Sequence, residues 1–110
     1  MRVVEYTVDR ERWSKMSIFD QMGNIYSEVG RTFKAKQNHD KERYDQALVR
    51  AIDLFDATSS VLVEQQSPKL KEVLRAKEEF LNACIAKNPA DQQGLDRYFM
   101  QFAVAARLNR

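Results

Sequence analysis

Apolar residues recur every three to four positions along most of the chain, with polar residues between them, which is the spacing of amphipathic helices. The spacing predicts four helices, over residues 9–36, 40–60, 67–87 and from about 92 onward. Asp9, Asp40 and Ser67 stand at the first three expected starts, where a side-chain oxygen can accept a hydrogen bond from a free backbone N–H group. With short polar loops between the helices, the pattern predicts an all-α fold, an antiparallel four-helix bundle.

Residues 1–8 lack this helical spacing and are predicted to form a short extended N-terminal arm. Val4, Tyr6 and Val8 lie on one side of it, which is the alternation of a strand or of a loose extended tail. An isolated strand needs a partner, for example the same arm of another subunit. Residues 9–110 then make one four-helix domain, because a chain of this length buries enough surface to fold without disulfides or a structural metal.

The helical projection also predicts which side of a helix meets the core. On the third helix the core side is expected to hold Leu70, Val73, Leu74, Phe80, Leu81, Cys84 and Ile85. On the first helix, Gly23 and Gly30 lie seven residues apart on one stripe, where they lower helix propensity but let another backbone come close. A close helix crossing is therefore expected at these two glycines.

Charged residues stand inside the apolar runs of the first three helices. With a turn of about 100° per residue, Lys77 projects near the centre of the apolar arc of the third helix. Glu28, Asp56 and Glu78 project to the rims of their helices, within reach of that lysine. Because a buried charge is costly unless it is paired, we expect Lys77 to meet one of these carboxylates. The cluster is then either a salt bridge that fixes helix register or a polar pocket that holds a ligand.

The fourth helix carries a second apolar stripe, opposite its core side, formed by Met100, Val104 and Leu108. A helix that is apolar nearly all round is buried nearly all round. Either this helix lies at the centre of a monomer or the stripe is a homodimer surface. The homodimer is favoured, because an exposed apolar patch usually marks an interface.

The charge balance gives little sign of a nucleic-acid or membrane partner. The 18 basic and 16 acidic residues are interspersed and leave a net charge of +2. No segment approaches the roughly 20 apolar residues of a membrane span. Cys84 is the sole cysteine, so an intrachain disulfide is impossible, and a cytoplasmic protein is expected.

One basic surface is nevertheless conceivable along the first two helices. Its cations would be Arg31, Lys34, Arg43 and Arg50. Trp13 and Tyr44 are close enough in the pattern to stack on bases, whereas Glu42, Asp45 and Asp53 interrupt the surface. A solvated charged face is the favoured interpretation, and nucleic-acid binding is not expected.

Two acidic runs point to a possible hydrolase. Ser27-Glu28-Val29-Gly30-Arg31 followed by Asp53-Leu54-Phe55-Asp56 resembles the acidic runs of the all-helical nucleoside triphosphate pyrophosphohydrolases similar to MazG. The resemblance implies magnesium-dependent hydrolysis, with Glu28, Asp53 and Asp56 as ligands and Lys77 as a phosphate contact. Ser27 and Arg31 stand where that family has acidic residues, and Asp53 projects away from the core, which disfavours a metal.

The four-helix layout, with a long first helix and a polar turn, resembles the HEPN superfamily. Its members act as toxin ribonucleases, as partners of nucleotidyltransferases or as inactive binding modules. Active members carry an Arg followed by about four to six residues and a His. Here seven residues separate Arg31 from His39, the sole histidine, which falls in a predicted loop. The resemblance therefore implies the fold but not the ribonuclease chemistry.

These observations favour a small cytoplasmic, non-catalytic interaction or regulatory module that forms a homodimer. We assign no catalytic residue, no metal ligand and no cofactor from the sequence. The alternatives are a divergent pyrophosphohydrolase similar to MazG and an HEPN-like toxin–antitoxin component. An unknown protein partner is also compatible with the pattern.

Overall fold

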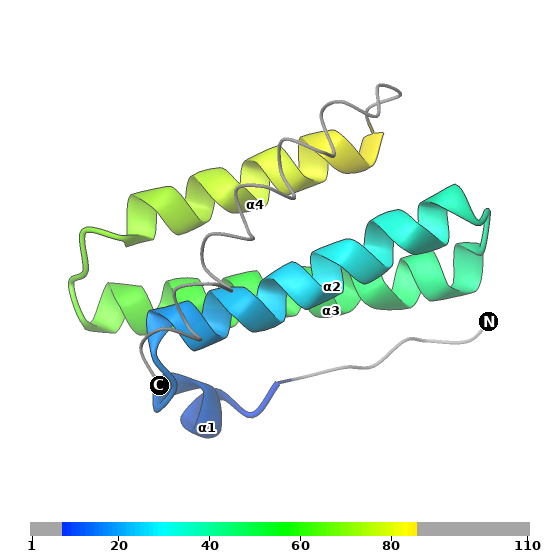
Figure 1. Ribbon diagram of the computed structural model, residues 1–110. Coiled ribbons are helices and arrows are strands. Elements are labelled where there is room, and N and C mark those ends of the chain that lie inside the picture. The colour runs from blue at the N-terminus through cyan, green and yellow to red at the C-terminus, as the bar shows by residue number, and fades with distance from the viewer. Residues whose placement is uncertain (1–7, 86–110) are drawn as a thin grey trace.

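The computed structural model describes residues 8–85, and in this part of the chain it contains α-helices joined by turns. The helices are α1 (Arg10–Ser14), α2 (Ile18–Gln37), α3 (Lys41–Glu64) and α4 (Leu70–Ile85) (Figure 1). The predicted all-α helical fold is confirmed. The helix expected from about residue 92, and the predicted N-terminal arm up to residue 7, lie outside the described residues. No helix within residues 8–85 has the length and apolarity that a membrane crossing requires.

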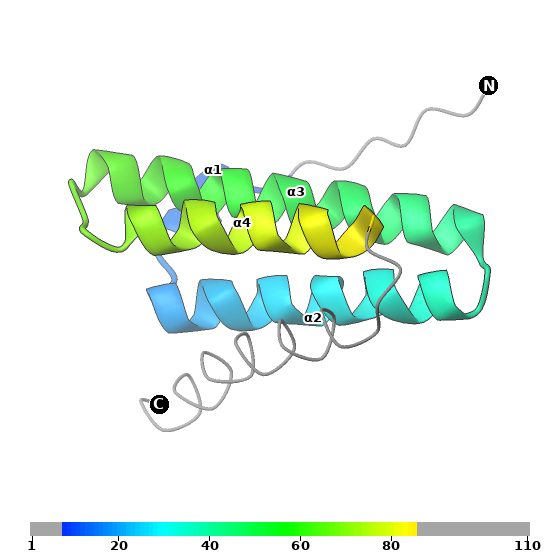
Figure 2. The same ribbon diagram turned by 90° about the horizontal axis from the view of Figure 1, so that it is seen from above.

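The long helices α2, α3 and α4 run side by side, and α3 contacts both of the others. α3 contacts α2 on one side and α4 on another, and the short helix α1 also contacts it. Figures 1 and 2 show the same geometry, with α4 lying over α3 and α2 beside α3. The turns after α2 and α3 are tight, and His39 and Gln66 take left-handed backbone angles in them, with φ of 54° and 52°. Successive helices therefore run antiparallel.

The first predicted helix is in fact two helices. Asp9 caps α1 as expected, with its side chain accepting a hydrogen bond from the Arg12 N–H group over 3.2 Å. The helix ends at Ser14, and Ser17 caps α2 by accepting from the Asp20 N–H group over 3.1 Å. Ser17 has an extended backbone with ψ of 157°, so the helix cannot pass through it.

Side-chain hydrogen bonds hold the break between α1 and α2 in place. The Trp13 indole N–H donates to Thr58 Oγ1 on α3 over 2.8 Å. The Gln21 amide nitrogen donates to the carbonyl oxygens of Trp13 and Met16, over 2.8 and 3.2 Å. These bonds satisfy buried polar groups that a continuous helix would place elsewhere. The apolar spacing alone gives no sign of them.

The other predicted boundaries are close to the observed ones. Asp40 caps α3, as expected, by accepting from the Arg43 N–H group over 3.2 Å, and the helix continues to Glu64, beyond the predicted end at Ser60. The Ser67 hydroxyl accepts from the Lys69 N–H group over 3.2 Å. This bond closes a turn that precedes α4, so the helix begins at Leu70.

The core is formed where α2, α3 and α4 meet. The Phe80 ring on α4 lies 5.8 Å from the ring of Phe33 on α2 and 5.8 Å from the ring of Phe55 on α3, measured between centroids. Met22, Ile25 and Val29 of α2 are fully buried, as are Phe55 and Phe80. Phe80 therefore joins all three long helices through aromatic contacts at ordinary packing distances.

Two expectations about the apolar side of α4 are wrong. Leu74 and Ile85, predicted to face the core, are 48% and 80% exposed. Among the described residues, a Cβ atom added at Gly30 would find no atom within 4 Å, so the close helix crossing expected at this glycine is not observed there. The core side of α4 is narrower than the apolar arc in its sequence, because α2 and α3 cover only the part that carries Val73, Ala76, Phe80, Ala83 and Cys84.

Candidate functional site

Lys77 and Asp56 are the two members of the predicted polar cluster that the structure brings together. Lys77 of α4 reaches across to α3, where its Nζ atom donates a hydrogen bond to Asp56 Oδ1 over 2.7 Å. Both side chains keep contact with water, being 27% and 49% exposed. Lys77 thus lies at the edge of the core and not at its centre. An ion pair in this position costs little desolvation and contributes little net stability.

Glu28 and Glu78, the other two members of that cluster, lie apart from this ion pair. Glu28 bonds within α2, where its Oε1 atom lies 2.6 Å from Arg31 Nη1. Its side chain is only 12% exposed, and the buried Oε2 atom has no hydrogen-bond partner among residues 8–85. Glu78 is exposed on α4 and has no ion pair with residues 8–85. The four residues therefore do not enclose one polar pocket.

Asp53 has a structural role that its outward projection does not indicate. Its Oδ2 atom accepts a hydrogen bond from the Val8 N–H group over 2.8 Å, and its Oδ1 atom lies 3.0 Å from Arg10 Nη2. The side chain is 18% exposed. Asp53 thereby fastens the start of the described chain to α3. A helical projection cannot predict these contacts of Asp53, because they depend on the path of the chain around Val8 and Arg10.

The three carboxylates of the hydrolase hypothesis are thus held separately. Glu28 pairs with Arg31, Asp53 with Arg10, and Asp56 with Lys77. Within residues 8–85, no three side chains of His, Cys, Asp or Glu are placed to hold a metal ion. A magnesium site needs several oxygen ligands around one point, and the described carboxylates do not provide that arrangement.

The most exposed large apolar side chains of the described residues lie on the outer side of α3 and α4. They are Val49 at 36%, Val63 at 58%, Leu74 at 48% and Ile85 at 80% exposure. We define the α3–α4 outer face by these side chains together with Ile52, Asp56, Lys77 and Leu81. At about 100° per residue, the α3 members fall within about 60° of one another and the α4 members within about 80°.

The Asp56–Lys77 ion pair lies in the middle of the α3–α4 outer face. Because α3 and α4 are antiparallel, Val63 lies toward the start of α4 and Val49 toward its end. The members follow intervals of three and four residues on α4 and of three, four and seven residues on α3, which is the spacing of helices that pack against a partner helix. The face is therefore apolar toward both ends and charged at its centre.

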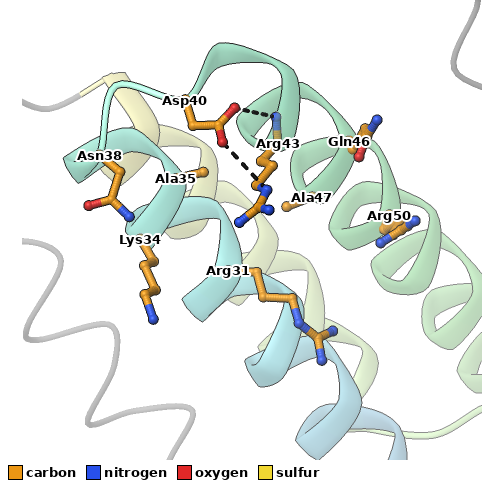
Figure 3. Close-up of a pocket in the computed structure, with 9 residues that line it drawn as sticks. All are labelled: Arg31, Lys34, Ala35, Asn38, Asp40, Arg43, Gln46, Ala47 and Arg50. Carbon is orange, nitrogen blue, oxygen red and sulfur yellow. Dashed lines mark hydrogen bonds and ion pairs between the residues drawn. The ribbon is translucent and has the colours of Figure 1, made fainter.

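A basic pocket lies at the other side of α3, between the end of α2 and the start of α3 (Figure 3). It has a volume of about 370 Å³. Its lining residues are Arg31, Lys34, Ala35, Asn38, Asp40, Arg43, Gln46, Ala47 and Arg50. All four cations of the basic surface considered from the sequence therefore gather here. Glu42 and Asp45, which interrupt that surface in the sequence, do not line the pocket.

Carboxylates hold two of the guanidinium groups at the pocket. Arg31 pairs with Glu28, and the Nε atom of Arg43 lies 3.5 Å from Asp40 Oδ2 (Figure 3). Ala35 and Ala47 are each 5% exposed, and their small side chains leave room between the helices. The pocket therefore combines oriented positive groups with open space, which an anion requires.

Trp13 and Tyr44, the aromatic residues that the sequence suggests for base stacking, make other contacts within the fold. Trp13 is 5% exposed and bonded to Thr58, so neither face of its ring is open to a base. Tyr44 lies beside Cys84 of α4, and burial, together with that thiol, raises the pKa of the Tyr44 phenol. Burial also raises the pKa of Cys84, against the opposing effects of Tyr44 and Lys36. Neither Trp13 nor Tyr44 lines the basic pocket.

The predicted dimer stripe of Met100, Val104 and Leu108 lies outside the described residues. The resemblances to the HEPN superfamily and to the pyrophosphohydrolases stay predictions. Comparisons of the chain with protein-family models, with characterised proteins and with solved structures found no match.

Proposed function

We propose that this protein is a small, non-catalytic helical interaction module that acts as a homodimer, with the α3–α4 outer face as its dimer surface. The observation that carries the proposal is the gathering of Val49, Val63, Leu74 and Ile85 on one face. Exposed apolar side chains that gather on one face usually mark a contact with another molecule.

The charge pattern of the α3–α4 outer face supports a second copy of the chain as the occupant. A two-fold symmetric interface places the same face on both subunits, so the face must complement itself. Asp56 and Lys77 lie side by side at its centre. A two-fold axis between them would place each carboxylate near the partner's ammonium group. Each charge would then keep an opposite charge beside it in the dimer. The apolar residues on either side would then cover one another.

The pairing of the acidic residues supports a binding role over hydrolysis. Glu28, Asp53 and Asp56 are each held by a different cation, so a metal would have to displace three ion pairs before it could gather them. The C-terminal stripe of Met100, Val104 and Leu108 supports the dimer independently from the sequence. It offers an alternative surface for the same assembly.

Light scattering after size-exclusion chromatography tests the proposal. The wild-type chain is expected to show a mass near twice 12.9 kDa. Leu74→Glu places a charge in the apolar part of the face and is expected to give the monomer mass. Asn82→Glu adds the same charge at an exposed position of α4 outside the face, so it should leave the dimer intact.

Two results would contradict the proposed surface. A wild-type monomer at high protein concentration would remove the homodimer altogether. A dimer that survives Leu74→Glu but dissociates with Val104→Glu would place the interface on the C-terminal stripe instead. Thermal melting of each variant checks that the substituted chains remain folded.

A further inference from the structure

We propose that the basic pocket between α2 and α3 binds a small oligophosphate, the diphosphate or triphosphate group of a small molecule. This site is independent of the dimer. Arg43, Ala47 and Arg50 project from the side of α3 that faces away from Asp56 and Val63. Occupation of the pocket and contact at the α3–α4 outer face can therefore be measured separately.

The charge of the pocket lining indicates a ligand with several negative charges. Four lining residues are cationic and one, Asp40, is anionic. Glu28, just outside the lining, pairs with Arg31, so four cations lie beside two carboxylates and the pocket has an excess of two positive charges. Groups of like charge on neighbouring helices repel one another unless an anion lies between them. A diphosphate or triphosphate can balance this excess, whereas a single carboxylate cannot.

The cations at the pocket are also suited to phosphate oxygens in their geometry. A guanidinium has five N–H donors in a plane, and one ion pair uses only part of them. Arg31 and Arg43 are each oriented by a carboxylate on the same helix or at its cap, through Glu28 and Asp40. The orienting bonds reduce the entropy that the side chains lose when a ligand binds. The remaining donors can contact phosphate oxygens in a forked arrangement.

The remaining lining residues indicate recognition of phosphate groups and not of a base. Asn38 and Gln46 add amide N–H donors, and Ala35 and Ala47 form the buried wall. None of the described lining residues is aromatic, so no ring is present there on which a nucleobase could stack. A volume of about 370 Å³ is in the range of small-molecule sites. A pocket of this size fits a compact phosphate group better than an extended nucleic-acid backbone.

Titration of the full, ¹⁵N-labelled chain with inorganic pyrophosphate tests this assignment by NMR. The backbone amide signals of residues 31–50 are expected to shift in a saturable manner, while those of residues 70–85 stay in place. Inorganic phosphate is expected to bind more weakly, because one phosphate group reaches fewer of the four cations. Equal affinity for phosphate and pyrophosphate would contradict the oligophosphate assignment.

Two arginine variants separate a specific site from general charge attraction. Arg43→Gln is expected to weaken pyrophosphate binding about tenfold, since it removes charged hydrogen-bond donors from the pocket. Arg75→Gln is the matched control. Arg75 is as exposed as Arg43, at 81% against 83%, and pairs with Glu79 on α4 much as Arg43 pairs with Asp40. It should change the affinity by less than about twofold.

A third variant is expected to act in the opposite direction. Asp40→Asn keeps an effective helix cap but removes the one negative charge of the lining, so it should tighten binding by about threefold. Equal losses in Arg43→Gln and Arg75→Gln, or the lack of a saturable shift at millimolar pyrophosphate, would overturn the site. A mixed-sequence single-stranded RNA that binds more tightly than pyrophosphate would assign the pocket to nucleic acid instead.

Discussion

The inner and outer sides of α3 both carry apolar residues, but they differ in what covers them. Leu54 and Phe55 on the inner side are 4% and 0% exposed, because α2 and α4 lie against them. Val49 and Val63 on the outer side are 36% and 58% exposed. Apolar spacing therefore identifies the helix, but it does not show which of its apolar residues the other helices of the chain will bury. The outer side is the part that a second molecule can bury.

Substitutions on the two sides of α4 are expected to differ most in their effect on stability. Phe80→Ala removes the ring that contacts Phe33 and Phe55 and should lower the free energy of unfolding by about 3–5 kcal/mol. Leu74→Ala, on the outer side, should cost less than about 1 kcal/mol in the dissociated monomer. Urea unfolding followed by circular dichroism at low protein concentration measures both values. Similar losses for the two variants would show that Leu74 belongs to the core.

A smaller change in the free energy of unfolding is expected when the pH is raised. Burial raises the pKa values of Cys84 and Tyr44 above their ordinary values of 9.0 and 10.0. The folded chain then holds these protons more tightly than the unfolded chain does. The free energy of unfolding should therefore be unaffected below these values and fall as pH rises through them.

Cys84→Ala isolates this contribution. The substitution removes the thiol and also the part of the Tyr44 pKa shift that the thiol causes. The variant should lose stability less steeply than the wild type as pH rises from neutral to above the ordinary pKa of tyrosine. Urea midpoints across that range measure the difference. Identical slopes for the two proteins would show that the thiol is not desolvated in the folded state.

Much of the fold could be predicted from local sequence patterns. Asp9 and Asp40 cap helices where expected, because capping depends on one side chain and the backbone three residues away. Ser17 is a cap of the same kind, followed by Asp20 in the first turn of α2, and this signal is hidden by the apolar spacing on both sides. The break it marks is held by Trp13 and Gln21, whose partners lie elsewhere in the fold.

The candidate sites were less predictable, because they depend on how the helices meet. Helical projection identifies Lys77 as the charge most in need of a partner, but it cannot choose between Glu28, Asp56 and Glu78, and only the packing of α4 on α3 selects Asp56. The outward position of Asp53 concealed its contacts with the chain before α1. The basic pocket forms because the turn at His39 brings the end of α2 beside the start of α3.

Mixing two charge variants tests whether the α3–α4 outer face complements itself. Asp56→Lys gives the face two positive centres and Lys77→Asp gives it two negative ones, so each variant alone should be a monomer. An equimolar mixture restores opposite charges across the interface and should return a mass near twice 12.9 kDa in light scattering. Single variants that remain dimers, or a mixture that stays monomeric beside a dimeric wild type, would show that this face does not pair with itself.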